Sequence, residues 1–357
     1  MPTIVSVGTA TLPYKFKQDA VKEYTKELFS DTFRDIDRFM SVFHNGQIES
    51  RYFVKDLKWY KNKHTFSEKN DAYIENALKY GCEAINNCLK NPHFLHSSID
   101  YEEIEAIFYI STTGLATPSI EARLMNRLPF SPHTKRIPIW GLGCAGGAAG
   151  LARAYEYCLA FPKAKVLVLA VEFCSLTFQP NDSSKSNLIG TSLFADGVAC
   201  VCVAGDEAVD KQLKPYILAS QSTLMRHAED VMGWDIRDDG FFVIFSKDIP
   251  YLIYSWLKPN VEQFLRSHCL TIADIDYFIA HPGGKKVLEA YQAALGIDEE
   301  KTAVSFQILK QFGNMSSVTV YFVLEQFMKQ PAKEGEYGLL LALGPGFSSE
   351  LVLLRWG

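Results

Sequence analysis

Short apolar runs of strand length recur along the chain, at 104–110, 166–171, 275–281 and 339–343. The stretches between them have the apolar spacing of helices, so strands and helices alternate. This alternation predicts an α/β fold whose sheets are largely buried. None of the apolar runs reaches the roughly 18 residues needed to cross a membrane, so no integral membrane association is expected.

Three segments of the first half of the chain recur in the second half in the same order. The paired segments are 104–110 and 275–281, 143–144 and 313–314, and 167–171 and 339–343, separated by 171, 170 and 172 residues. Such a constant offset predicts two similar halves, 1–208 and 209–357, divided at the turn-rich segment AGDEAVDK. If a pseudo-twofold axis relates the halves, Cys144 and Asn314 face each other at the centre of the molecule.

The composition is that of an ordinary globular protein. Of 357 residues, 48% are hydrophobic and 22% are charged, which is enough for a large core. Lys and Arg number 36 against 41 Asp and Glu, a formal charge of −5, and no block of like charge stands out. A broad basic surface for nucleic acid is therefore not expected. The N-terminus reads as a first strand and lacks the charged region and long apolar run of a secretion signal.

The eight cysteines are scattered, without the CxxC pairs of zinc sites or the density of a disulfide framework. This pattern favours a reducing, cytoplasmic setting and gives no sign of a metal site. Cys200 and Cys202 alternate within VACVCV, which places both on one face of a strand, where we expect them to be buried. Neither a Walker-type phosphate loop nor GxGxxG after a strand is present, so no nucleotide cofactor is expected.

Cys144 lies in a glycine-flanked turn, GLGCAGG, between a strand-like run and an alanine-rich helix. The glycines permit a tight bend. At a helix N-terminus, free N–H groups and the helix dipole favour thiolate over thiol, and thiolate is the form that attacks thioesters. By itself the motif fits equally well a small buried cysteine in a tight contact between helix and sheet.

His281 and Asn314 occupy turns of the second half. His281 follows an apolar strand and precedes Pro-Gly-Gly. Its neutral N–H can donate to a developing oxyanion, and its charged form would stabilise a thiolate. The amide of Asn314 is a neutral donor suited to an oxyanion. The alternatives are a turn histidine and a helix N-cap asparagine, and for Asn314 we expect one of its two roles to dominate.

A Gly-Pro-Gly turn, Gly344, Pro345 and Gly346, stands between two apolar strands. It fits either a rigid hairpin connection or a scaffold that lines the cavity beside Cys144. Taken together, GLGCAGG, HPGG, FGNMSS and this turn resemble the chalcone-synthase superfamily of type III polyketide synthases. The resemblance covers nearly the whole chain, and TGLATPS at 113–119 is similar to bacterial members that make alkylpyrones.

This resemblance implies a thiolase-like fold, with two pseudo-symmetric halves in a layered αβαβα core, and a homodimer. It implies that Cys144 takes a medium- or long-chain fatty acyl group from acyl-CoA, while His281 and Asn314 hold the thioester oxygen of malonyl-CoA as CO2 is lost. No acyl carrier protein would be required. The implied products are triketide or tetraketide alkylpyrones, or alkylresorcinols. Two alternatives are a single condensation, as in 3-oxoacyl-acyl-carrier-protein synthase III, and a catalytically silent acyl-CoA-binding homologue.

The resemblance also implies which residues shape the substrate cavity. Phe194 matches one of the family's two gatekeeper phenylalanines, whereas the second falls at Val243, which argues against plant-like handling of aromatic starters. Thr117 matches a residue that reaches into the partner's cavity, and Arg51 aligns with the basic region that contacts CoA phosphates. The remaining expected cavity positions are Cys174, Thr177, Trp234, Ser316, Gly344, Pro345 and Gly346.

Overall fold

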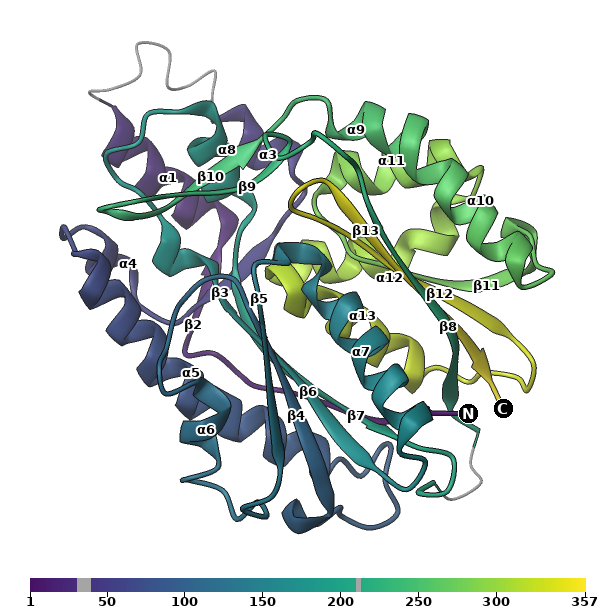
Figure 1. Ribbon diagram of the computed structural model, residues 1–357. Coiled ribbons are helices and arrows are strands. Elements are labelled where there is room, and N and C mark those ends of the chain that lie inside the picture. The colour runs from purple at the N-terminus through teal and green to yellow at the C-terminus, as the bar shows by residue number, and fades with distance from the viewer. Residues whose placement is uncertain (31–39, 210–212) are drawn as a thin grey trace.

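The computed structural model describes residues 1–30, 40–209 and 213–357. In these ranges nine strands form one mixed sheet, in the order β11-β12-β13-β8-β1-β7-β6-β4-β5 (Figure 1). The elements of the first part are β1 (Thr3–Thr9), β2 (Tyr14–Lys17), α1 (Gln18–Phe29), α3 (Ser41–Asn45), β3 (Ser50–Phe53), α4 (Leu57–Tyr60), α5 (Phe66–Leu89), η1 (Tyr101–Glu103), β4 (Ile104–Ser111), α6 (Ile120–Leu124), β5 (Lys135–Trp140), η2 (Gly143–Ala145), α7 (Gly146–Ala160), β6 (Lys165–Phe173), η3 (Cys174–Thr177), α8 (Lys185–Leu193) and β7 (Asp196–Ala204). Those of the second part are β8 (Pro215–Leu224), β9 (Met232–Arg237), β10 (Gly240–Phe245), α9 (Ile249–Leu252), η4 (Ile253–Leu257), α10 (Lys258–Ser267), η5 (Ile272–Asp274), β11 (Ile275–Ala280), α11 (Lys285–Leu295), α12 (Glu299–Phe312), η6 (Ser316–Val318), α13 (Thr319–Lys329), β12 (Tyr337–Gly344) and β13 (Ser348–Trp356).

Two runs of four strands have the same arrangement within this sheet. In β1-β7-β6-β4 and in β8-β13-β12-β11, the first two pairings are antiparallel and the third is parallel. The two runs join through β1 and β8 at a single residue pair, Thr3 with Tyr216. The repeated segments 104–110 and 275–281 therefore correspond to β4 and β11, which are equivalent strands of two similar halves.

The helices and the two halves of the sheet form five alternating layers. α7 and α13 lie between the halves, α5 covers the outer face of one half, and α10 and α11 cover the outer face of the other (Figure 1). In β6, Val166 and Val168 join the central apolar cluster, whereas Leu167 and Leu169 join the cluster beside α5. A strand that is buried on both faces needs the continuous apolar sequence seen here. The layers are those of the expected αβαβα architecture.

The contact between the two central helices requires a residue without a side chain. A Cβ atom at Gly147 of α7 would lie 2.3 Å from the carbonyl oxygen of Ser317, so only glycine permits this close approach. The hydroxyl of Tyr321 in α13 donates to the carbonyl oxygen of Gly147 across the same contact, at 2.8 Å. The turns that precede both helices, which carry Cys144 and Asn314, are therefore held side by side.

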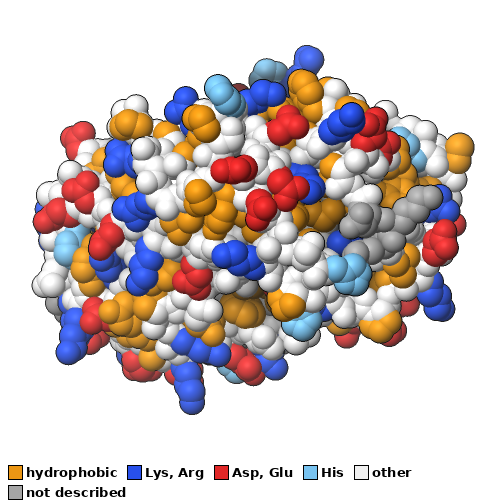
Figure 2. All heavy atoms as spheres, turned by 90° about the horizontal axis from the view of Figure 1, so that it is seen from below, with side chains coloured by type: hydrophobic (Ala, Val, Ile, Leu, Met, Phe, Trp, Pro, Cys, Tyr) orange, Lys and Arg blue, Asp and Glu red, His pale blue; other side chains and the backbone are white. Residues whose placement is uncertain are grey.

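Cys200 and Cys202 of β7 are fully buried on the face toward α5, as their alternation predicted. All eight cysteines are free thiols. No helix among the described residues is both long enough and apolar enough to span a membrane. On the face seen in Figure 2, acidic and basic side chains are interspersed and no broad area has a single sign of charge.

Two small two-stranded sheets, β2–β3 and β9–β10, are separate from the main sheet. The hairpin β9–β10 lies beside α8 in the upper part of the view in Figure 1. Side chains from α1, β3, α4, α8, β9 and β10 together line an apolar cavity. These peripheral elements thus build the apolar cavity, while the layered core fixes the turns beside it.

Candidate active site

Glycines shape the turn that carries Cys144. After β5 ends, Gly143 begins the short helix η2 with φ of +48°, a left-handed conformation that favours glycine. The Gly-Pro-Gly turn packs against it, since a Cβ atom at Gly344 would lie only 2.6 Å from the carbonyl oxygen of Leu142. The Gly-Pro-Gly turn is a hairpin connection, because it joins β12 to antiparallel β13, and it also packs against the turn of Cys144. A role for it in lining the substrate cavity stays a prediction.

Asn314 approaches Cys144 closely, with 4.0 Å between the side-chain oxygen and the sulfur. Gly313, at φ of +73°, turns the chain out of α12. The Asn314 backbone then donates to the carbonyl oxygen of Leu193 at 2.9 Å and accepts from the N–H of Ala195 at 2.8 Å. The backbone at Asn314 is therefore held by two hydrogen bonds, one to the last residue of α8 and one to the segment that follows it.

The Asn314 side chain serves two partners at once. Its oxygen accepts a hydrogen bond from the N–H of Ser316 at 2.8 Å, and its nitrogen donates to the carbonyl oxygen of Gly283 at 3.0 Å. The two ends of the amide thus bind separate groups. Which of the two expected roles of Asn314 dominates stays a prediction. An amide nitrogen carries two N–H groups, so a second donor is present for a substrate oxygen.

His281 follows β11 and continues its pairing, donating its backbone N–H to the carbonyl oxygen of Leu341 at 2.8 Å. The ring is buried, and neither ring nitrogen has a hydrogen-bond partner. A Cβ atom at Gly283 would lie 3.8 Å from Nε2, so the ring lies over the turn that also receives the Asn314 amide. Three turns thus bring Cys144, Asn314 and His281 to one region.

Burial controls the charge of the two ionisable groups. It raises the pKa of the Cys144 thiol to about 12, against the opposing effect of hydrogen bonds with the Ser316 and Asn314 side chains. It lowers the pKa of His281 to about 3. Both shifts favour the neutral forms and oppose the effect expected of the helix N-terminus on the thiol. Attack on a substrate must therefore be accompanied by removal of the thiol proton.

A buried carboxyl group beside the site was not anticipated from the sequence. Glu172, at the end of β6, is fully buried and accepts hydrogen bonds from the hydroxyls of Thr113 and Ser317 at 2.9 and 2.7 Å. Burial raises the pKa of Glu172 to about 7 despite these hydrogen bonds. The one signal in the sequence was a lone carboxylate, Glu172, near the end of the otherwise apolar run VLVLAVEF. A charge at the end of a buried strand marks a strongly hydrogen-bonded or functional position.

An apolar cavity with a volume of about 50 Å³ adjoins these turns. Phe194 links it to the site, since this residue lines the cavity and its backbone forms a bridge with Asn314. Five of the predicted cavity residues are present in its wall. The complete lining is Val21, Tyr24, Phe53, Leu57, Tyr60, Cys174, Ser175, Thr177, Phe178, Asn187, Gly190, Thr191, Phe194, Trp234 and Val243.

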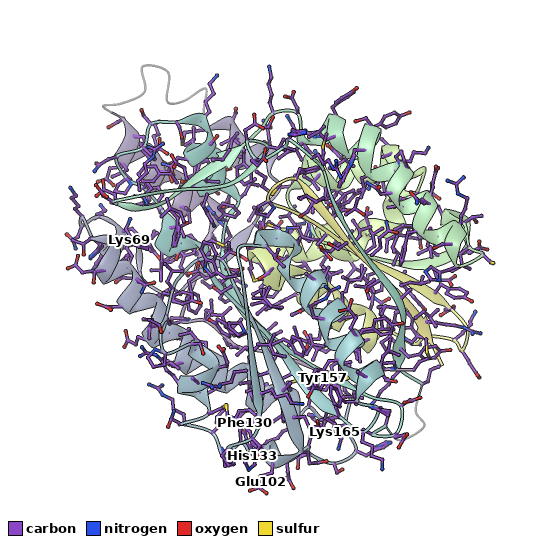
Figure 3. The ribbon with its side chains drawn as sticks, viewed as in Figure 1. Lys69, Glu102, Phe130, His133, Tyr157 and Lys165 are labelled. Atoms are coloured by element: carbon purple, nitrogen blue, oxygen red, sulfur yellow. The ribbon has the colours of Figure 1, made fainter. Side chains whose placement is uncertain are left out.

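The hairpin β9–β10 forms one wall of this cavity and is fastened at its turn. The ring of Trp234 in β9 lies 6.0 Å from that of Phe194. Gln179 donates from Nε2 to the carbonyl oxygen of Phe241 at 3.1 Å. Lys69 of α5, labelled in Figure 3, donates in turn to the side-chain oxygen of Gln179 at 3.2 Å. The position of Trp234 therefore depends on a buried polar contact outside the cavity.

Two family models together match nearly the whole chain. The N-terminal domain of chalcone and stilbene synthases matches residues 1–207, and the C-terminal domain matches residues 216–356. The chain belongs to the chalcone and stilbene synthase family. It is a type III polyketide synthase of the bacterial type, a chalcone synthase-like acyltransferase.

Relatives and solved structures agree with this family. A chalcone synthase-like protein of Bacillus subtilis (strain 168) is 55% identical over 100% of this chain and 99% of its own length. A 1,3,6,8-tetrahydroxynaphthalene synthase of Streptomyces peucetius subsp. caesius is 34% identical over 99% of this chain and 93% of its own. The crystal structure of the 1,3,6,8-tetrahydroxynaphthalene synthase of Streptomyces coelicolor A3(2) has a TM-score of 0.91 at 27% identity and covers 99% of both chains. The shared architecture is the expected thiolase-like fold.

Five further predicted cavity residues of this type III polyketide synthase are not among the described residues that line the cavity, namely Thr117, Ser316, Gly344, Pro345 and Gly346. Ser316, at φ of +51°, is adjacent to the site, and its side chain opposes the rise in the pKa of the Cys144 thiol. Thr117 is exposed in a loop, preceding Pro118 through a cis peptide bond. Within one chain, Thr117 is not among the described residues that line the cavity. A role for Thr117 in a partner's cavity stays a prediction.

Arg51 cannot contact a CoA phosphate, which corrects the prediction made for it. Its side chain is fully buried, and Nη1 donates to the carbonyl oxygens of Thr191 and Phe194, both at 2.7 Å. Burial lowers the pKa of Arg51 to about 9, against the opposing field of Asp196. The guanidinium therefore holds the end of α8 and the Phe194 segment from inside the protein. A sequence match identifies a basic residue but not the direction of its side chain.

Basic side chains gather instead along a surface groove bordered by β2, α1, α3 and α12. Its lysines are Lys15, Lys17, Lys22, Lys285 and Lys310. Lys285 directly follows the Pro-Gly-Gly turn of His281, so one edge of the groove adjoins the site.

Proposed function

We propose that this type III polyketide synthase extends a medium- or long-chain fatty acyl-CoA with malonyl-CoA and releases triketide or tetraketide alkylpyrones, or alkylresorcinols. The apolar cavity carries the proposal, because it adjoins the turns of Cys144 and Asn314 through Phe194. An alkyl chain gains about 0.8 kcal/mol for each CH2 group that it buries. Val243 supports an alkyl occupant further, since it leaves more room than the phenylalanine of the family pattern.

Starter loading uses Cys144 and His281. The sulfur attacks the thioester carbonyl of acyl-CoA while its proton passes to the neutral imidazole. The bond between the carbonyl carbon and the CoA sulfur then breaks, and the imidazolium returns the proton to the departing CoA thiolate. The low pKa of His281 favours this return. The acyl group remains on Cys144 with its alkyl chain in the cavity.

Extension uses Asn314 and His281 as hydrogen-bond donors. Malonyl-CoA loses its carboxylate as CO2, and the electron pair of the broken C–C bond forms an enolate. The enolate oxygen accepts hydrogen bonds from the Asn314 amide and from an imidazole N–H. The enolate carbon attacks the acyl carbonyl, and Cys144 departs as the thiolate. Return of the lengthened chain from CoA to Cys144 permits another round.

We propose that the lysine groove binds the phosphates of CoA. Lys310 and Lys285 lie 3.1 and 3.5 Å from carboxylate oxygens of Glu49 and Glu289, but these pairs are largely exposed and weak, so a phosphate can displace them. Replacing Lys15 and Lys285 with alanine should raise KM for both CoA substrates several-fold with little change in kcat. Steady-state kinetics at increasing salt would check this, since added salt should shrink the difference from wild type. KM values equal to those of the wild type would exclude the groove as the binding site of the CoA phosphates.

We further propose a homodimer, as is general for type III polyketide synthases. Among the described strands, β5 pairs only with β4, which leaves its other edge open. Leu115 and Trp140, joined to this edge, are 42% and 43% exposed. Thr117 of the same loop would then reach the partner's cavity. Light scattering measures the assembly, and a monomer at micromolar concentration would contradict the proposal.

Incubation of the purified enzyme with saturated acyl-CoAs of graded length and labelled malonyl-CoA tests the proposed reaction. Pyrones should form without acyl carrier protein, and Cys144→Ala should form none although it folds. No pyrone from any starter would contradict the proposal. A single 3-oxoacyl product formed only with acyl carrier protein would favour the one-step condensing reaction. We place the activity in the cytoplasm, since all eight thiols are free.

A further inference from the structure

A single partition separates the apolar cavity from the surface between α1 and α4. Tyr24 of α1 and Leu57 of α4 line the cavity, and the same two side chains line a surface pocket whose other walls include Glu27 and Lys61. Among the described residues, these two are the ones that both spaces share. Each therefore has one side toward the substrate space and the other toward solvent.

Packing alone holds the Tyr24 ring in this position. Its hydroxyl is buried without a hydrogen-bond partner, whereas the hydroxyl of Tyr60, also in the cavity wall, is bonded to Ser175 at 2.5 Å. A buried hydroxyl without a partner forfeits about 1–3 kcal/mol. Turning the ring toward the surface pocket would return this hydroxyl to water and would break no hydrogen bond. Tyr24 can thus turn outward without losing a hydrogen bond, whereas Tyr60 cannot.

The outer rim of the partition is also weakly held. Lys61 Nζ lies 3.2 Å from a carboxylate oxygen of Glu27 and joins α4 to α1, but the two side chains are 53% and 70% exposed. Exposed ion pairs of this kind contribute only about 0–1 kcal/mol. α4 itself is only four residues long. Neither the ion pair nor the helix strongly opposes a small separation at this point.

We propose that Tyr24 and Leu57 form a movable end wall that sets the longest acyl chain the enzyme accepts. This inference rests on the proposed function, because the fatty acyl group on Cys144 is the occupant. A chain that fits within the cavity leaves the wall closed. A longer chain displaces the Tyr24 ring, and its end emerges between α1 and α4. Tyr24 and Leu57 are then specificity-determining residues for the starter.

The test compares Tyr24→Ala and Leu57→Ala with the wild type over a series of saturated acyl-CoAs. Both changes thin the wall, so the ratio of kcat/KM for long over short starters should rise about tenfold or more, the effect of one or two methylenes in an apolar pocket. Tyr24→Trp thickens the wall and should move the preference toward shorter chains. Tyr254→Ala removes a tyrosine that is 58% exposed and lines neither space, so it should leave the ratio unchanged.

A measurement on the wild type complements the variants in case one of them does not fold. A long acyl chain with a nitroxide at its last carbon, once attached to Cys144, should be accessible to a water-soluble relaxation agent, whereas a shorter labelled chain should be shielded. If no fatty acyl-CoA acylates Cys144, the proposed function itself fails. If acylation occurs but folded variants keep the wild-type ratio, or the label is shielded at every length, the end wall alone is overturned.

Discussion

At the residue scale, burial decides the charge at the reacting centre. It keeps the Cys144 thiol protonated and His281 neutral, although Ser316 and Asn314 both favour the thiolate. A protonated thiol reacts slowly with alkylating and oxidising agents. In the proposed reaction, attack by Cys144 on a thioester therefore requires removal of the thiol proton. Proton transfer and bond formation are coupled as a result.

Replacing Asn314 with alanine should slow the decarboxylation of malonyl-CoA by roughly 10²–10³-fold, the cost of one oxyanion donor. Acylation of Cys144 by the starter should be affected much less, because that step does not form the malonyl enolate. Release of labelled CO2 and intact-protein mass spectrometry measure the two steps separately. Asn126→Ala, at an exposed position, serves as the control. An unchanged rate of CO2 release in Asn314→Ala would remove the assigned role.

Arg51→Met should lower the free energy of unfolding by roughly 1–3 kcal/mol, because it leaves the carbonyl oxygens of Thr191 and Phe194 buried without their donor. It should not selectively raise KM for CoA substrates. Urea denaturation and steady-state kinetics measure the two effects. Lys17→Met, in the surface groove, should show the reverse pattern of stable protein and raised KM. A stable Arg51→Met protein with a raised KM would restore the original interpretation of Arg51.

The sequence could place Cys144, His281 and Asn314 in turns, because glycines and the constant offset of the repeat are local and periodic signals. It could not show that Arg51 points inward or that Glu172 borders the site. Both facts depend on segments more than a hundred residues apart: Arg51 binds carbonyls of α8 and its end, and Glu172 accepts from Ser317. Burial of a charge is a property of the assembled fold.

At the scale of elements, buried strands were predictable and the cavity wall was not. The run 339–343 lies within β12, and 104–110 within β4, because a strand buried on both faces must be apolar throughout. The hairpin β9–β10 has no such signature, since ten of its twelve strand residues are half-buried or exposed. Its position is set by tertiary contacts at its turn. Trp234 was therefore assigned to the cavity by resemblance alone.

Gln179→Leu should loosen this hairpin, because it removes the donor to the carbonyl oxygens of Asp239 and Phe241 and the acceptor for Lys69. Amide hydrogen exchange should accelerate in 232–245, while β6 and β7 remain protected. The starter preference should broaden as Trp234 becomes less fixed. If the hairpin amides of Gln179→Leu exchange at the wild-type rate, this account is contradicted.

At the scale of the whole molecule, two buried carboxyl groups couple stability to pH. Burial raises the pKa of Glu172 from 4.5 and of Asp196 from 3.8, both to about 7. The folded protein therefore binds these protons more tightly than the unfolded chain. Their contribution to stability is complete below about pH 4 and is lost as the pH rises through about 7.

Glu172→Gln removes one of these ionisations, so the free energy of unfolding should fall less between pH 4 and pH 7 than in the wild type. The difference should approach about 3 kcal/mol, at about 1.4 kcal/mol for each unit of pKa. Chemical denaturation at a series of pH values measures both slopes. Glu102→Gln, an exposed residue at the far end of the molecule in Figure 3, should leave the wild-type slope unchanged. If the free energy of unfolding changes with pH equally in wild type and Glu172→Gln, the raised pKa is wrongly assigned to Glu172.

The close contact of α7 with α13 at Gly147 also makes each half of the chain chemically dependent on the other. Cys144 comes from one half, His281 and Asn314 come from the other, and the two halves of the sheet share one residue pair. Neither half alone possesses a complete reaction centre. If the polypeptide were divided after β7, two inert fragments would result. Turnover recovered on mixing them would then report directly how tightly they dock.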